Sequence, residues 1–241
     1  MSDAARLRSV ILAGGKGTRL MPYTTALPKP LMPVGEMPIL EIIVRQLKKS
    51  GITDLTLSVG YLHSLLRAYF GDGERWGVDI DYSLEEEPLG TAGPIALVDD
   101  LTDTFLVMNG DLLCSIDYRD MVERHLASGA VATIAAYPKE VKVQLGVLET
   151  EGDMLVDYVE KPVMRYRVSM GIYVMSRAVL DHLPKGQRMD LPDLIKTLLR
   201  EKRKVNLYGF EGYWRDIGTM DEYATANQEF ETVAPSLNIG A

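Results

Sequence analysis

The sequence predicts an α/β fold in which a mostly parallel, Rossmann-like central sheet is flanked by helices. Through the first half of the chain, short apolar runs alternate with amphipathic helical segments, which is typical of parallel strands joined by crossover helices. A glycine-rich stretch directly follows the first apolar run. From residue 145 to residue 175 strand patterns follow one another, which predicts an inserted mixed or antiparallel portion.

The composition is ordinary for a globular protein of 241 residues, with 46% hydrophobic and 25% charged residues. A chain of this length can bury one core, so we expect residues 1–241 to form a single domain. The net charge of −8 argues against binding to nucleic acid or to an anionic membrane. The single cysteine, Cys114, excludes an internal disulfide. No signal peptide or transmembrane run is apparent, so a cytoplasmic location is expected.

The first half of the chain predicts the order β-α-β-α-β. The apolar run at residues 10–13 has the length of a buried strand. A helix is expected at residues 38–51, because Pro38 stands near its start, apolar residues recur at helical spacing and Gly51 closes it. The next three elements are a strand, a helix and a strand, at residues 55–59, 64–70 and 78–83. Ligands of such sheets bind beyond the carboxyl ends of the strands.

The second half of the chain changes character after residue 137. Residues 145–149 and 154–159 flank a turn that contains Gly152, which predicts a hairpin. The segment at residues 191–203 has leucines on one helical face. The other expected elements are strands at residues 105–109, 130–137, 168–175 and 205–210, and helices at residues 118–128 and 222–230.

A candidate phosphate site follows the first strand. Gly14, Gly15 and Gly17 lack a Cβ atom, so backbone N–H groups there can approach an anion. Arg19 adds a planar guanidinium that suits phosphate, and Lys29 lies between two prolines that stiffen its backbone. Neither the P-loop pattern nor a complete dinucleotide fingerprint is present, and a plain tight turn is an equally common use of glycines. We interpret the combination as a polyphosphate cradle.

Two other loops end predicted strands at the same edge of the sheet. Glu85 begins a loop at residues 85–94, where a carboxylate could accept the two adjacent donors of guanine. Capping of a helix N-terminus is an equally weighted alternative. Asp111 follows the strand at residues 105–109 and a glycine, which is a suitable position for a ligand of Mg²⁺, although aspartate is also common in turns.

The stretch from Leu12 to Leu40, LAGGKGTRLMPYTTALPKPLMPVGEMPIL, resembles the signature of the sugar-1-phosphate nucleotidyltransferases, or nucleotide-sugar pyrophosphorylases. The loop at residues 85–94 and the segment YWRDIGT at residues 213–219 are similar to those of mannose-1-phosphate guanylyltransferases. The resemblance implies transfer of a nucleotidyl group from a nucleoside triphosphate to a sugar 1-phosphate, with Mg²⁺ as cofactor and pyrophosphate as product. The first expectation is GTP with mannose 1-phosphate.

Two alternatives stay open. The enzyme could use UTP, dTTP or CTP with a glucose, heptose or amino-sugar 1-phosphate. Some relatives are non-catalytic regulators that bind nucleotide sugars, and the intact set of charged residues at the motif positions weighs against that class. The expected partners are small-molecule substrates, and a homodimer is possible. We expect no C-terminal β-helix, since the sequence shows no hexapeptide repeat.

The resemblance implies a role for each matching residue. The implied catalytic residues are Arg19, Lys29, Asp111 and Lys161. The implied nucleotide-binding residues are Leu12, Ala13, Gly14, Gly15, Gly17, Thr18, Glu85, Pro88, Gly90 and Thr91. The implied sugar-phosphate-binding residues are Asn109, Gly110, Gly146, Glu160, Lys161, Ser169 and Gly171, with serine at 169 where many members have asparagine. The implied ligands of Mg²⁺ are Asp111 and Asp216. The nucleotide-binding part is then expected at about residues 8–137 and the sugar-binding part at about residues 138–231.

Overall fold

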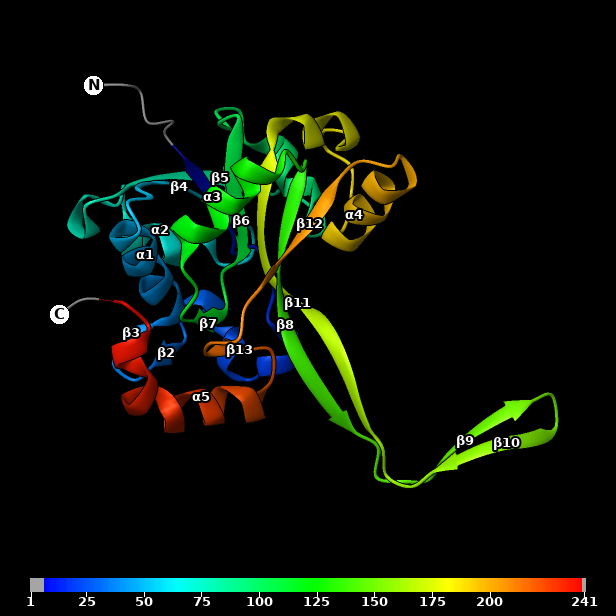
Figure 1. Ribbon diagram of the computed structural model, residues 1–241. Coiled ribbons are helices and arrows are strands. Elements are labelled where there is room, and N and C mark those ends of the chain that lie inside the picture. The colour runs from blue at the N-terminus through cyan, green and yellow to red at the C-terminus, as the bar shows by residue number, and fades with distance from the viewer. Residues whose placement is uncertain (1–6, 240–241) are drawn as a thin grey trace.

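The computed structural model describes residues 7–239 and is built on a seven-stranded sheet of order β12-β8-β11-β6-β1-β4-β5 (Figure 1). The four strands of its parallel half are β1 (Arg8–Leu12), β4 (Asp54–Val59), β5 (Asp79–Leu84) and β6 (Thr104–Asn109). The other half contains β8 (Ala132–Lys142), β11 (Val163–Ser176) and β12 (Val205–Gly209). β11 runs antiparallel to both neighbours, β6 and β8. The expected mostly parallel α/β class is confirmed. Residues 1–6, where no signal peptide was expected, lie outside the described part.

Helices cover both faces of the sheet. Successive side chains of a strand point to opposite faces, so apolar side chains lie on both faces and pack against helices there. Val10 and Ile11 are both fully buried, but they belong to separate apolar clusters. The cluster around Ile11 includes residues of α1 (Ile39–Lys49), α2 (His63–Phe70), α3 (Tyr118–Ser128) and α5 (Met220–Val233). The cluster around Val10 includes the leucines of α4 (Leu191–Arg200). Within residues 7–239, no helix combines the length and apolar character needed to cross a membrane.

Two short strand pairs and several 3-10 helices were not expected from the sequence. β7 (Leu112–Cys114) pairs with β13 (Trp214–Asp216), and β2 (Pro33–Val34) pairs with β3 (Met37–Pro38). The 3-10 helices are Thr18–Leu20, Tyr23–Thr25, Lys29–Leu31, Glu74–Trp76, Gly93–Leu97, Arg177–His182 and Ala234–Ser236. The first three lie between β1 and β2, so the stretch after the glycine loop is a series of tight turns.

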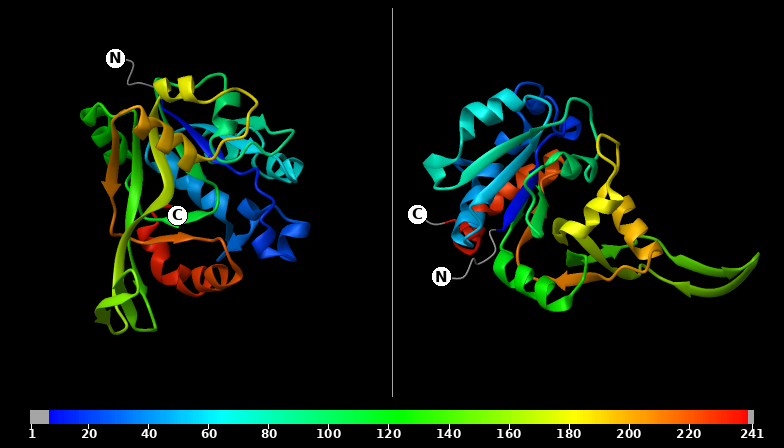
Figure 2. Two further views of the ribbon diagram at one scale, coloured as in Figure 1. Left: turned by 90° about the vertical axis from the view of Figure 1, so that its right-hand side faces the viewer. Right: turned by 90° about the horizontal axis from the view of Figure 1, so that it is seen from above.

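An extended arm, here defined as residues 138–168, leaves the body of the protein. Strands β8 and β11 continue beyond the segments expected at residues 130–137 and 168–175, and they run outward as a two-stranded ribbon. The ribbon leads to the expected hairpin, formed by β9 (Val147–Glu151) and β10 (Met154–Val159). Figure 1 and the right-hand view of Figure 2 show the hairpin well separated from the sheet and its helices.

Helix α5 closes the carboxyl-terminal part of the chain against the turn between β2 and β3. The Tyr223 hydroxyl donates a hydrogen bond to the Pro33 carbonyl (2.7 Å), and the Gly35 amide donates one to Asn227 Oδ1 (3.1 Å). Gly35 has a φ of 61°, and a Cβ atom added to it would lie 2.3 Å from the ring of Phe230.

Replacement of Gly35 by alanine is expected to destabilise the protein by about 2–4 kcal/mol, because the left-handed backbone conformation and the clash with Phe230 both disfavour a Cβ atom. The matched control is Gly129→Ala, whose φ is 64° and whose Cβ would meet no atom within 4 Å. Urea unfolding of both variants measures the difference. An equal loss of free energy of unfolding in both variants would show that α5 does not pack tightly on this turn.

Candidate active site

The pairing of β7 with β13 places two aspartates side by side at the end of β6. Asp111 directly precedes β7, and Asp216 is the last residue of β13, where it lies opposite Leu112. The Ile217 amide donates a hydrogen bond to the Asp111 carbonyl (3.1 Å) and fixes this arrangement. Two carboxyl groups that are far apart in the sequence therefore share one site.

Lys29 is the cation of this site. Its side chain is almost completely buried, and its ammonium forms an ion pair with Asp111 Oδ2. The other oxygen of that carboxylate, Oδ1, is buried and makes no hydrogen bond. Burial is the main cause that raises the pKa of Asp216, the negative charge of Asp111 raises it further, and Lys29 lowers it in part. Lys29 thus acts on the carboxyl groups of both Asp111 and Asp216 in a partly buried place.

Arg19 reaches the same place from the glycine loop. A Cβ atom added to Gly218 would lie 3.4 Å from Nη2 of Arg19, so the guanidinium lies against the segment that follows Asp216. Its charge also acts on the Asp216 carboxyl, where it opposes the rise in pKa. Arg19 itself is exposed. The guanidinium therefore lies at an accessible edge of the carboxylate pair, where it can contact an anionic ligand.

The glycine loop is held in place from both sides. The Ala13 amide donates a hydrogen bond to the Ser58 carbonyl (2.8 Å), and Thr24 Oγ1 donates one to the Gly17 carbonyl (2.8 Å). Gly17 has a φ of 60°, which a side chain would disfavour. A Cβ atom on Gly15 would meet no atom within 4 Å, so the loop is open to a ligand at that residue.

Glu85 lies against this loop. A Cβ atom added to Gly14 would be 2.5 Å from Oε1 of Glu85, so only glycine leaves room for the carboxylate. Oε1 accepts a hydrogen bond from Ser58 Oγ (3.2 Å), and Oε2 accepts one from the Leu89 amide (3.0 Å). Burial raises the pKa of Glu85, and these two hydrogen bonds oppose that rise. The alternative role of capping a helix is wrong, because the next helical segment begins at Gly93 without an acidic residue in its first turn.

A cavity of about 270 Å³ lies beside Asp216. Its lining residues are Thr91, Asn109, Ser169, Met170, Gly171, Tyr173, Leu191, Pro192, Trp214 and Asp216. Five of these were predicted as site residues, and the cavity brings them together. Trp214 and Tyr173 were not among the site residues predicted from the sequence. The Trp214 indole donates a hydrogen bond to the Met170 carbonyl (3.3 Å), and the hydroxyls of Tyr173 and Ser169 are hydrogen bonded at 2.9 Å.

The remaining nucleotide-site residues lie near this cavity or the glycine loop. The Thr91 amide donates to Asp190 Oδ1 (3.1 Å) and its hydroxyl accepts from the Leu191 amide (2.8 Å), which ties the Glu85 loop to the start of α4. The Gly110 amide donates to the Leu12 carbonyl (2.9 Å). The other predicted positions there are Ala13, which is buried, Gly90, which lies against Met189, and Thr18 and Pro88, which are exposed.

Three predicted residues are not brought to the site. Gly146, Glu160 and Lys161 lie in the arm, on the two strand connections at its bend. The side chains of Glu160 and Lys161 are 59% and 62% exposed, and their charged groups are 3.7 Å apart. Gly146 packs against the Tyr158 hydroxyl, which also donates a hydrogen bond to Glu160. Their expected role in binding the sugar phosphate stays a prediction.

The chain belongs to the nucleotidyl transferase family, whose model matches residues 8–233. A mannose-1-phosphate guanyltransferase of Candida albicans is 34% identical over 230 residues, which cover 90% of this chain and 62% of that protein. A UTP--glucose-1-phosphate uridylyltransferase of Synechocystis is 32% identical and covers 90% of this chain and 61% of that protein. This chain therefore spans about three-fifths of these relatives.

Among solved structures, HddC of Yersinia pseudotuberculosis superimposes with a TM-score of 0.72 and 26% sequence identity. The match covers 93% of this chain and 99% of that one. The family resemblance identified from the sequence motifs is confirmed by these comparisons.

Proposed function

We propose that this chain transfers a nucleotidyl group from a nucleoside triphosphate to a sugar 1-phosphate, giving a nucleotide sugar and pyrophosphate. The observation that carries the proposal is the position of Lys29 and Asp111. Their ion pair lies between an open glycine loop, which suits the phosphates of a nucleotide, and a cavity of the size of a sugar. Membership in the nucleotidyl transferase family supports it.

The reaction needs no protein nucleophile, because a phosphate oxygen of the sugar 1-phosphate attacks the α-phosphorus in line and pyrophosphate leaves. Catalysis of this kind consists of positioning and charge neutralisation. In our proposal the backbone of Gly14, Gly15 and Gly17 holds the nucleotide, while Arg19 stabilises the leaving pyrophosphate. Lys29 neutralises charge at the α-phosphate, and its burial keeps it fixed in the site before the substrates bind.

Magnesium fits the two aspartates. The buried, unpartnered Oδ1 of Asp111 and the nearby carboxyl of Asp216 offer the oxygen ligands that this ion prefers. Asp111 and Asp216 would hold the ion, and substrate phosphates would supply further ligands. When bound, it would orient the phosphates and screen their mutual repulsion.

GTP and mannose 1-phosphate are the proposed substrate pair. Glu85 supports the choice of guanine, because its carboxylate lies beside Gly14 and can accept the two adjacent donors of that base. The guanylyltransferase names of several relatives support the same pair. The uridylyltransferase relative favours a second candidate, UTP with glucose 1-phosphate.

Pyrophosphate release by the purified protein with Mg²⁺ tests the proposal. GTP, UTP, dTTP, CTP and ATP would each be combined with the 1-phosphates of mannose, glucose and N-acetylglucosamine. By far the fastest release is expected with GTP and mannose 1-phosphate, with only low activity for the other pairs. Faster release with another pair would keep the reaction class and reject the substrates. No release from any pair, together with a higher melting temperature in the presence of a nucleotide sugar, would indicate a binding protein instead.

The change Glu85→Gln is expected to lower kcat/KM for GTP by about 10- to 100-fold and to leave the low activity with UTP unchanged, because an amide N–H replaces one acceptor. The matched control is Glu87→Gln, an exposed residue of the same loop. A loss of kcat/KM that is equal for GTP and UTP would contradict the assignment.

The pH dependence offers a second readout of Glu85. Because burial raises its pKa, the carboxyl takes up a proton at a higher pH than an exposed glutamate does. Use of GTP should therefore fall as the pH drops through this raised pKa, and the fall should be absent from the pH profile of Glu85→Gln.

A further inference from the structure

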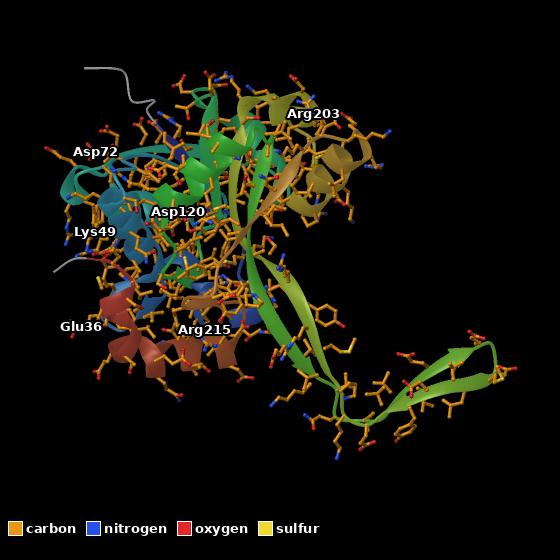
Figure 3. All side chains as sticks on the ribbon, in the orientation of Figure 1. Glu36, Lys49, Asp72, Asp120, Arg203 and Arg215 are labelled. Atoms are coloured by element: carbon orange, nitrogen blue, oxygen red, sulfur yellow. The ribbon has the colours of Figure 1, made fainter. Side chains whose placement is uncertain are left out.

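The arm is regular up to its bend. From Tyr137 opposite Val168 to Lys142 opposite Val163, six successive residue pairs join β8 and β11 without a shift of register. Beyond the bend the β9–β10 hairpin is paired only with itself. Figure 3 shows the side chains of this hairpin pointing into open space on both sides, with no other part of the chain beside them. A two-stranded hairpin alone is at best marginally stable in water, so a surface that covers it would stabilise it.

The hairpin has one face without charged residues and one face that mixes acidic and apolar residues. Leu148 lies opposite Tyr158, and Thr150 lies opposite Leu155, so these side chains share a face. Leu148, Leu155 and Tyr158 are 55%, 55% and 57% exposed. The other face carries the residues of the intervening pairs, which are three acidic residues, Glu149, Glu151 and Asp157, and three apolar ones, Val147, Met154 and Val159. Three large apolar side chains on one face of an exposed hairpin mark it as a protein contact surface.

The cavity lacks a cation that the substrate requires. Of the described residues that line it, none is lysine or arginine, and Asp216 contributes a carboxyl group. The phosphate of a sugar 1-phosphate is an anion, and charge-assisted hydrogen bonds from a cation are its usual means of recognition. Lys161 is the residue expected to supply that cation, but it lies at the bend of the arm.

Lys161 cannot reach the cavity of its own chain while the arm is paired. Ser169 lines the cavity, and the six paired residues between Val163 and Val168 separate it from the bend. At about 3.3 Å per residue these strands span roughly 20 Å. Folding the bend back onto its own cavity would break the whole ladder. The same strands hold the bend away from the body of its own chain, where another molecule can contact it.

We propose that two copies of this chain exchange their arms, so that Lys161 of each copy enters the cavity of the other and binds the phosphate of the sugar there. The inference rests on the proposed function. A second copy accounts for two observations. Its cavity lacks the cation that the arm of the first copy carries, and its surface would cover the exposed hairpin of that arm. A two-fold exchange is also closed, so it produces two equivalent sites and leaves no arm uncovered.

Complementation between two defective variants tests the exchange. Lys29→Ala removes a residue of the body, and Lys161→Ala removes a residue of the arm. Each variant alone should have very low activity. After the two are unfolded and refolded together in equal amounts, activity should recover to about a quarter of the wild-type value, because half of the dimers are mixed and each mixed dimer has one intact site. Activity no higher than the mean of the separate variants would show that Lys161 serves its own chain and would overturn the proposal.

Molecular mass gives a test that does not depend on activity. Sedimentation equilibrium of the wild-type chain should show twice the chain mass of 26.8 kDa. The double variant Leu148→Glu, Leu155→Glu should sediment as a monomer, whereas Leu126→Glu, a similarly exposed leucine of α3, should remain dimeric. If no substrate pair gives pyrophosphate, the proposed function fails and this measurement still decides whether the arm joins two copies. A wild-type monomer, or a dimer that the arm substitutions leave intact, would overturn the exchange.

Discussion

Replacement of Lys29 by alanine is expected to lower the rate of pyrophosphate release by about a thousandfold, because the site loses a fixed cation at the point where negative charge develops. Lys29 is buried and is already paired with Asp111, so its ammonium is in place before substrates bind. Without it, the carboxyl groups of Asp111 and Asp216 would face the phosphates with only the exposed Arg19 nearby. Electrostatic repulsion would then oppose both binding and reaction.

The measurement is kcat and KM for the preferred substrate pair, together with a thermal melt. The matched control is Lys16→Ala, which removes an exposed lysine from the glycine loop and should change the rate little. A folded Lys29→Ala protein with near wild-type activity would reject the role of this residue. Failure to fold would be visible in the melt, and Lys29→Met, which keeps most of the side-chain volume, would then separate charge from packing.

The change Asp111→Asn should have an effect of similar size and a different signature. Asparagine keeps the shape of the side chain but removes the negative charge that would hold Mg²⁺ through the unpartnered Oδ1. We expect a loss of about 10²- to 10³-fold in kcat at low Mg²⁺, with part of the activity restored as the Mg²⁺ concentration rises. A titration of activity against Mg²⁺ measures this.

The control for this titration is Asp99→Asn, an aspartate whose side chain is 83% exposed, pairs with Lys185 and does not line the cavity. It should titrate like the wild-type protein. If Asp111→Asn also has an unchanged Mg²⁺ requirement, Asp111 does not bind the ion, and its carboxylate serves only to position Lys29.

The regular elements of the parallel half could be predicted because buried strands and helices have recognisable patterns of apolar residues. Strand β6 is an apolar run bounded by polar residues, and α1 has apolar residues at helical spacing with a closing glycine. Strand β13 could not be predicted in this way, since three partly buried residues, Trp214 to Asp216, carry no periodicity. Its existence depends on pairing with β7, about a hundred residues earlier.

The full length of the arm strands could not be predicted from the sequence either. The predicted strands ended near Tyr137 and Val168, where the apolar pattern ends, but hydrogen bonding between β8 and β11 continues to Lys142 and Val163. A ladder needs no buried side chains, so exposed strands give a weak signal. The placement of Tyr173 and Trp214 around one cavity likewise depends on two long-range pairings, of β11 with β6 and of β13 with β7, which no local pattern reveals.

The glycine loop, Lys29 and Asp111 were predicted as separate pieces of a site, but only the resemblance to a family joined Asp111 with Asp216. The structure supplies the physical reason. Asp216 reaches Asp111 through a strand pair of three residues on each side, so the contact exists only after distant parts of the chain have paired.

This order of assembly has a consequence during synthesis on the ribosome. The glycine loop, Lys29 and Asp111 emerge early and belong to strands and turns that can pair among themselves. Asp216 follows about a hundred residues later, which at roughly 5–20 residues per second is a delay of roughly 5–20 s. A nascent chain halted in that interval would contain the nucleotide loop without its second carboxylate. It could bind a nucleotide before it could turn one over.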